Sequence, residues 1–274
     1  MELKNIPNVL EVFSKNKDGV SPFSGDAILV SENYIAVIDG ATPKGTRLWQ
    51  GQKGDCFVSS FIKSVIENME GNLTATEAIT KINDSVNEIY IKNGTSYEEL
   101  LPEERLQASL VIYSVHRREI WSFGDCKFMI NGKNYDTVRQ ADTLLAYLRA
   151  LYTELARIDG EKSENDVGRE AIMPLLRKVI GLANIDCEFG YDAINGGPVK
   201  PENTRVVKLN EGDFVVLASD GYPELFETLE KTENNLFILL EKDPDCIKEL
   251  RSTKGLKKGN ESYDDRSYIS FEVI

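Results

Sequence analysis

The stretch that decides the fold is Ala36-Val37-Ile38-Asp39-Gly40-Ala41-Thr42. It ends an apolar run that begins at Tyr34, and an acid and a glycine follow the run directly. This pattern predicts a buried strand that carries a carboxylate to its own end, where the glycine lets the backbone turn sharply. The same pattern recurs over 214–221, which ends in Ser219-Asp220-Gly221.

Further acids stand at the edges of other expected strands. Asp26 precedes the run 27–30, Asp125 follows the run 120–124, and Asp264-Asp265 precedes the last strand. The runs 26–30 and 34–39 are joined by only a few residues, so we expect an antiparallel pair with Asp26 and Asp39 at the same end. Converging carboxylates repel one another unless cations hold them, and oxygen ligands suit magnesium or manganese. The sequence therefore predicts a carboxylate-lined site for hard divalent metals.

Composition narrows the class of protein. The 274 residues carry a formal net charge of -13, which disfavours binding to nucleic acid. Four widely spaced cysteines, without a CxxC pair, and the lack of a signal peptide predict a reducing cytoplasm. No apolar stretch reaches the roughly 18 residues that a membrane helix needs. A single histidine, His116, argues against triads and histidine-rich zinc sites, and we expect it in a surface turn.

Strands dominate both halves of the chain, and helices follow hairpins in pairs, which indicates an α+β layered fold in one domain. We expect strands at 9–14, 26–30, 34–39, 106–115, 120–123, 127–130, 204–209, 213–219 and 266–274. The runs 204–209 and 213–219 are expected to pair with each other. Helices are expected near 56–67, after a cap at Thr74 or Thr76, twice within 138–182, and within 225–250. The leucine-rich faces of 144–180 are expected to be buried as core or cover, and a partner site is the alternative.

The acids occur in an order that matches a known family: Asp26, Asp39-Gly40, Gly124-Asp125-Cys126, Ser219-Asp220-Gly221, Asp264-Asp265. This order, over roughly 26–274, resembles the PPM (type 2C) metal-dependent Ser/Thr protein phosphatases. The resemblance implies a four-layer αββα sandwich of two antiparallel sheets flanked by helices, with the metals at one end. Residues 1–274 would form a single PPM-type phosphatase domain, in which 138–182 is a helical flap-like insertion that selects the substrate or partner.

The resemblance also implies a chemistry and a set of ligands. Two Mn²⁺ or Mg²⁺ ions, with a third at a looser site, would activate a water that hydrolyses phosphoserine or phosphothreonine in proteins. Asp39 would bridge two ions, and Asp220 and Asp264 would complete the catalytic set. The implied metal ligands are Asp26, Asp39, Gly40, Asp125, Asp220 and Asp264. Asp125 would serve the third ion, for which Glu224 is a further candidate, and Asp265 would be a solvated neighbour.

The chain departs from the family pattern in two places. Ala41-Thr42 stand where many members have a histidine that protonates the leaving group. The segment 10–25 has no arginine to hold the phosphate, for which Lys15, Lys17, Lys44 and Arg47 are candidates. Two alternatives therefore stay open: a catalytically weak or inactive PPM-like binding module, and a phosphatase of a small phosphorylated metabolite. The sequence does not indicate an oligomeric state.

Overall fold

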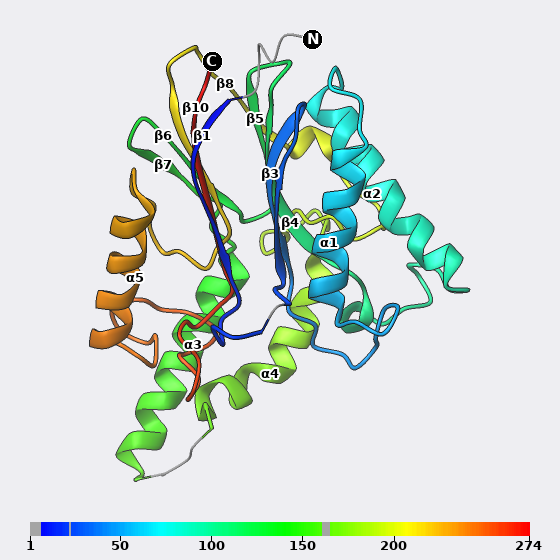
Figure 1. Cartoon of the computed structure of the whole chain (residues 1–274). Helices are drawn as coiled ribbons and strands as arrows, with labels where there is room; N and C mark the ends of the chain where they lie inside the picture. The colour runs from blue at the N-terminus through cyan, green and yellow to red at the C-terminus, as the bar shows by residue number, and fades with distance from the viewer. Residues whose placement is uncertain (1–6, 22, 161–164) are drawn as a thin grey trace.

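Two five-stranded antiparallel sheets lie face to face, with helices on the outer face of each (Figure 1). The computed structural model describes residues 7–21, 23–160 and 165–274. One sheet has the order β2-β3-β4-β5-β8, with strands Asp26–Val30, Tyr34–Gly40, Ala108–Ser114, Glu119–Phe123 and Arg205–Lys208. The other has the order β1-β10-β9-β6-β7, with strands Asn8–Lys15, Arg266–Glu272, Phe214–Ala218, Lys127–Ile130 and Lys133–Tyr135.

The apolar run at β3 is continuous because both faces of its sheet are covered. Successive side chains of a strand point to opposite faces. Tyr34, Ala36 and Ile38 therefore pack under the outer helices, while Ile35 and Val37 face the second sheet. Because both faces are buried, every position from Tyr34 to Ile38 is apolar, instead of alternating between apolar and polar residues.

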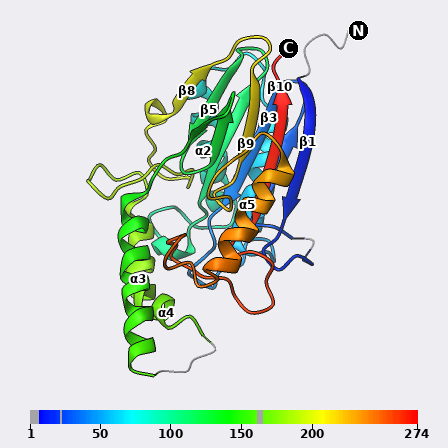
Figure 2. The same cartoon turned by 90° about the vertical axis from the view of Figure 1, so that its left-hand side faces the viewer.

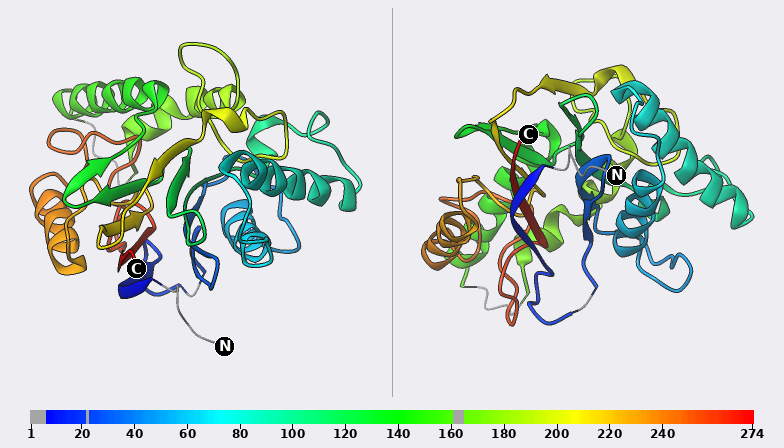
Figure 3. Two further views of the ribbon diagram at one scale, coloured as in Figure 1. Left: turned by 90° about the horizontal axis from the view of Figure 1, so that it is seen from above. Right: turned by 45° about the horizontal axis from the view of Figure 1, so that its top comes forward.

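Two amphipathic helices cover the β2-β3-β4-β5-β8 sheet, α1 (Gly54–Glu67) and α2 (Ala75–Lys92). Seen from above, they form the layer outside this sheet (Figure 3). Their buried residues recur every three or four positions, as a helix with one apolar face requires: Phe57, Ile62, Ile66, Ile79, Ile82, Val86 and Ile89. Thr74 caps α2, and it forms a capping box with Glu77.

The opposite sheet is covered by α5 (Leu229–Lys242), which Figure 2 shows lying in front of β9 and β10. Leu236 and Leu240 of α5 pack on Val216 and Tyr268. With α1 and α2 on the other side, this completes the αββα arrangement, so the predicted fold class is confirmed. Three short 3-10 turns, η1 (Pro102–Glu104), η2 (Ile180–Leu182) and η3 (Pro201–Asn203), lie in the connections.

The helices expected within 138–182 are α3 (Gln140–Ile158) and α4 (Val167–Val179), which lie together at one end of the sandwich (Figure 1). Leu145 of α3 packs on Ile172 and Leu176 of α4. The expectation that the leucine-rich faces are buried is wrong for α3. Its leucines at 144, 148, 151 and 155 are exposed by 40–57%.

The expected pairing of 204–209 with 213–219 is also wrong. β8 pairs with β5 in one sheet, while β9 pairs with β10 and β6 in the other. The chain therefore crosses between the sheets there, and it crosses again between β5 and β6 at Gly124-Asp125-Cys126. The first crossing leads into β9, which runs toward Asp220, and the second crossing itself contains Asp125.

None of the helices described combines the length and the apolar character that crossing a lipid bilayer demands.

Candidate metal centre

The first part of the site is a row of polar residues across β2, β3 and β4. Asp26, the first residue of β2, lies directly opposite Asp39 of β3, as the sequence predicted. Asp39 in turn lies opposite Ser109 of β4. At Gly40 the backbone comes so close to α1 that a Cβ atom would lie 2.3 Å from the Asp55 carbonyl oxygen. A glycine is therefore required immediately after Asp39.

Asp125 joins this row from the crossing between the two sheets. Gly124 has a φ of +96°, and a Cβ there would lie 2.4 Å from Ser109 Oγ. Glycine thus lets the chain turn next to Ser109, whose hydroxyl donates a hydrogen bond to Asp125. Arg139 Nη1 donates to Asp125 Oδ2 at 3.1 Å.

Asp220 and Asp264 arrive from the other sheet. Asp220 follows β9, and Asp264 precedes β10, the strand that pairs with β9. Lys254 forms an ion pair with Asp264 Oδ2, and Lys17 Nζ lies 3.7 Å from Asp264 Oδ1. Neighbouring strands of one antiparallel sheet therefore bring these two acids to the same end.

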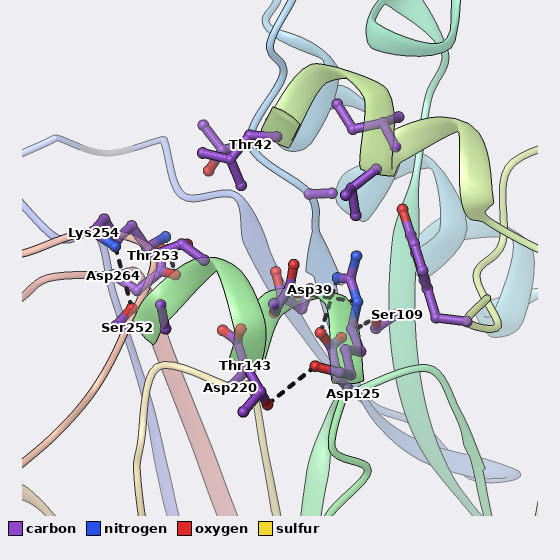
Figure 4. Close-up of a pocket in the computed structure, with 18 of the residues that line it drawn as sticks. Asp39, Thr42, Ser109, Asp125, Thr143, Asp220, Ser252, Thr253, Lys254 and Asp264 are labelled. Carbon is purple, nitrogen blue, oxygen red and sulfur yellow. Dashed lines mark hydrogen bonds and ion pairs between the residues drawn. The ribbon is translucent and has the colours of Figure 1, made fainter. Parts of the chain in front are cut away.

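A cavity of about 420 Å³ unites four of the acids, Asp39, Asp125, Asp220 and Asp264. Figure 4 shows these side chains gathered in it, with Asp264 beside Lys254. Gly40 also lines the cavity, while Asp26 does not and is 7% exposed. Residues of α3 and α4 close the other side, so the helices within 138–182 border the site. Glu224 lines a second cavity, together with Asn134.

Three of the carboxylates lie where charge is costly. Burial and the neighbouring acids raise the pKa of Asp26 to about 8 and that of Asp220 to about 7. Burial, together with Asp220 and Asp26, also raises the pKa of Asp39 well above its ordinary value. Without a cation, these three acids therefore tend to keep their protons, because the surrounding protein does not balance the negative charge of their ionised forms.

The other two carboxylates are balanced by cations of the chain. Burial acts to raise the pKa of Asp125, but Arg139 and the Ser109 hydrogen bond outweigh it and hold that pKa below its ordinary value. Lys254 and Lys17 likewise outweigh burial and lower the pKa of Asp264. The cluster is thus divided into three uncompensated and two paired acids.

The donor chemistry of the cluster fits hard divalent cations, because all of its donors are oxygen atoms. Asp26 Oδ2 is buried and has no hydrogen-bond partner among the described residues. Among the described residues, no three His, Cys, Asp or Glu side chains lie close enough in their present conformations to hold a metal ion. Two of the acids are turned to Arg139 and Lys254 instead. Asp125 and Asp264 would bind an ion in competition with these partners.

Asp265 differs from the solvated neighbour that was expected. It is 5% exposed, less than most acids of the cluster. Its carboxylate accepts hydrogen bonds from the backbone N–H groups of Gly25 at 2.7 Å and Lys17 at 2.9 Å. This acid therefore anchors the segment that leads into β2.

Comparison with known proteins shows which solved structures this fold is similar to. No protein-family model matches the sequence, and no curated protein does so either. Among solved structures the chain is similar to the serine/threonine phosphatase Stp1 from Staphylococcus aureus, at 15% identity and a TM-score of 0.52, with 100% of this chain and 98% of that chain covered. It is similar to PppA of Pseudomonas aeruginosa, at 14% identity and a TM-score of 0.51, covering 99% and 100%. The catalytic domain of the serine/threonine protein phosphatase PstP, in complex with two manganese ions, matches at 12% and 0.50, covering 96% and 97%.

The chain has the fold of the PPM phosphatases. At these identities the likeness concerns the fold alone.

Within this PPM fold, the sequence interpretation missed the cations that border the acids. Arg139 and Arg169, from the start of α3 and of α4, and Lys254, from the loop before β10, all line the cavity. Of the four expected phosphate-binding residues only Lys44 lines it. The basic composition of 251–258 was the one signal in the sequence, because no local pattern reveals which distant acid a lysine will reach.

The other three candidates do not line the cavity. Lys15 pairs with Glu261 at 2.6 Å, Lys17 pairs with Asp264 and Asp265, and Arg47 lies over the Trp49 ring. His116 is exposed in the turn between β4 and β5, as expected.

Proposed function

We propose that the chain is a metal-dependent phosphomonoesterase that hydrolyses phosphoserine and phosphothreonine in proteins. One observation carries the proposal: acids from both sheets of a PPM fold, Asp39, Asp125, Asp220 and Asp264, line a single cavity. Three of the cluster's carboxylates form no ion pair with the described residues, and burial and neighbouring acids raise their pKa values. A charge distribution of this kind attracts divalent cations.

Each acid has a proposed role in holding Mn²⁺ or Mg²⁺, with two ions at the centre and a third at a looser site. Such ions supply a water that is nucleophilic near neutral pH, and they offset the charge of the phosphoryl oxygens. Asp39 lies centrally, between acids of the two sheets, so it would hold ions together with the neighbouring Gly40 carbonyl. Asp220 and Asp264 would complete the catalytic set from the opposite sheet. Asp26, which lies opposite Asp39 on the neighbouring strand, would contribute a further carboxylate. Asp125 would serve a third ion.

The substrate class is inferred from the similar proteins. Stp1 and PstP are named serine/threonine phosphatases, so we infer a phosphorylated protein substrate for this chain, in the cytoplasm. A cavity of about 420 Å³ also has room for a small phosphoester, so a metabolite substrate is the alternative to test.

A non-catalytic module is the second candidate, and the ion pairs favour it. Arg139 and Lys254 already occupy Asp125 and Asp264, as cations that need no metal. No histidine is among the described residues that line the cavity, so an imidazole to protonate the leaving group is lacking there.

Hydrolysis assays separate these candidates. Para-nitrophenyl phosphate and a phosphothreonine peptide would be incubated with and without Mn²⁺, using wild type, Asp39→Asn and the exposed control Asp84→Asn. We expect Mn²⁺-dependent turnover that falls by at least about 100-fold in Asp39→Asn, because a central carboxylate of the charge cluster is lost. The control should behave as wild type.

Three outcomes would change the assignment. Turnover that needs no metal or survives Asp39→Asn contradicts the metal mechanism. Turnover of the small ester without the peptide favours a metabolite substrate. No turnover of either substrate favours the binding module.

A further inference from the structure

Three cations from separate segments face the cavity beside the acids. Lys44 lies in the loop after β3, Arg169 lies in the first turn of α4, and Lys254 lies in the loop before β10. Figure 4 shows Lys254 next to Asp264, on the side of the cavity away from Asp125. The cavity thus has an acidic floor formed by the sheets and a basic wall formed by these three residues, which we call the cationic wall.

Among the described residues, two of the three cations have no acidic partner. Lys44 Nζ donates to the Thr42 carbonyl at 2.6 Å, and Arg169 Nη1 donates to the Thr253 carbonyl at 2.7 Å. Across residues 7–21, 23–160 and 165–274, neither forms an ion pair with a carboxylate. Burial is the main cause that lowers the pKa of Lys44 to about 7, and Arg169 and Lys254 lower it further. An anion placed among the three would relieve the repulsion.

A buried arginine holds in place the two chain segments that carry Arg169 and Lys254. Arg149 of α3 is 1% exposed, and its Nη2 atom donates to Asp166 Oδ2 at 2.7 Å. Asp166 accepts the backbone N–H of Arg169 at 2.8 Å and thereby caps α4. Arg149 Nη1 also donates to the Ser252 carbonyl at 3.1 Å, in the loop that carries Lys254. One guanidinium therefore fixes the segments that carry Arg169 and Lys254 relative to each other, without a bound ligand.

We propose that the cationic wall binds the phosphate dianion of a phosphomonoester and presents it to the acid cluster. Arginine and lysine form short, charge-assisted hydrogen bonds to phosphate oxygens, and the planar arginine fork can contact two oxygens at once. The inference rests on the proposed function and adds to it the group that holds the substrate. It also gives α4 a specific role, since Arg169 would bring the helices bordering the site into contact with the phosphate.

Binding of inorganic phosphate tests the wall separately from catalysis. Titration calorimetry would compare wild type, Arg169→Gln, Lys44→Met and the conservative Arg169→Lys, each with and without Mg²⁺. Arg177→Gln and Lys178→Met are matched controls, because both residues are exposed on α4 and neither lines the cavity. We expect the dissociation constant for phosphate to rise about tenfold or more in Arg169→Gln and Lys44→Met, as for loss of a hydrogen bond to a charged group. Arg169→Lys should recover part of the affinity, and both controls should stay within about twofold of wild type.

Two further readouts separate binding from folding and from metal binding. Melting temperatures identify variants that fail to fold, and Mn²⁺ titration should give wild-type metal affinity in Arg169→Gln. With para-nitrophenyl phosphate and a phosphothreonine peptide, KM should rise in both wall variants for either substrate, since the phosphate is the shared group.

The outcomes distinguish the two proposals. Phosphate binding that needs Lys44 and Arg169, without any hydrolysis, would support the wall and remove the phosphatase. Hydrolysis with unchanged phosphate affinity in both variants would overturn the wall alone. A wild-type protein that binds no phosphate in either condition would overturn the wall as well.

Discussion

At the scale of single residues, neighbouring acids in the site have different tasks. Asp264 faces the cavity and is paired with Lys254, whereas Asp265 is buried and accepts two backbone N–H groups. A carboxylate suits this second position because it is an acceptor only. The sequence shows two identical side chains in a row, so nothing in it distinguishes the residue that faces the ligand from the one that holds the backbone.

We predict that Asp265→Asn destabilises the metal-free protein by about 1–3 kcal/mol, because one of the carboxylate acceptors becomes an NH₂ group that faces N–H donors. Urea denaturation with EDTA present measures this change. Asp186→Asn is the control, since Asp186 is highly exposed and should shift the free energy of unfolding by less than about 0.5 kcal/mol. Equal effects of the two substitutions would contradict the anchoring role of Asp265.

At the scale of elements, the start of α2 depends on a single threonine. Thr74 accepts the backbone N–H of Glu77, and the Glu77 side chain accepts the backbone N–H of Thr74. Thr76, the other candidate in the sequence, lies inside the first turn of the helix.

We predict that Thr74→Ala lowers the free energy of unfolding by about 1 kcal/mol, because a backbone donor of the helix N-terminus loses its acceptor. Thr76→Ala removes a similar side chain without removing a cap, so it should cost clearly less. Chemical denaturation followed by far-UV circular dichroism measures both. A larger loss in Thr76→Ala would show that the helix starts later than described.

The helices also show which features the sequence could predict and which it could not. Periodicity predicted α3, but not which of its faces would be buried. Ala141, Leu145 and Arg149 face the protein, whereas the face with more leucine, including Leu148 and Leu151, is exposed. Arg149 is buried because Asp166 and backbone carbonyls satisfy its donors, and those partners are distant in the sequence or beyond a loop. A hydrophobicity pattern contains no information about such partners.

The same contrast between local sequence signals and tertiary packing applies to the acids and to the strand pairings. Asp39 and Asp220 could be found because each ends an apolar strand, a signal that lies within a few residues. Lys254 and Arg169 could not, because their position beside the acids results from tertiary packing. The crossing between β8 and β9 was mistaken for a hairpin because a short polar connection has the same composition in either case.

At the scale of the whole molecule, the acid cluster draws on both sheets, so its charge state bears on their association. Asp26 and Asp39 come from one sheet, and Asp220 and Asp264 adjoin strands of the other. Without metal, the protein keeps protons on Asp26 and Asp220 that the unfolded chain would release, since burial and the other acids raise their pKa values to about 8 and about 7. Stability from these groups is therefore lost as pH rises from their unfolded pKa through these values.

We predict that the free energy of unfolding of the metal-free protein falls as pH rises from about 5 to about 7. Asp125 and Asp264, whose pKa values are lowered, lose their stabilising effect only at more acidic pH, below this window. Urea midpoints at several pH values with EDTA measure the slope, which Asp26→Asn should reduce. Saturating Mn²⁺ should oppose the trend, because it stabilises the ionised acids. A metal-free protein that gains stability over this pH range would contradict the description of the cluster.

The pairing of β1 with β10 sets the order in which the molecule can be completed. Ser14 and Ser267 share a hydrogen bond although 253 positions separate them along the chain. At a synthesis rate of about 5–20 residues per second, the first strand leaves the ribosome roughly 10–50 s before its partner exists. During that interval β1 has no partner strand, so its place in the sheet can form only after β10 has been synthesised.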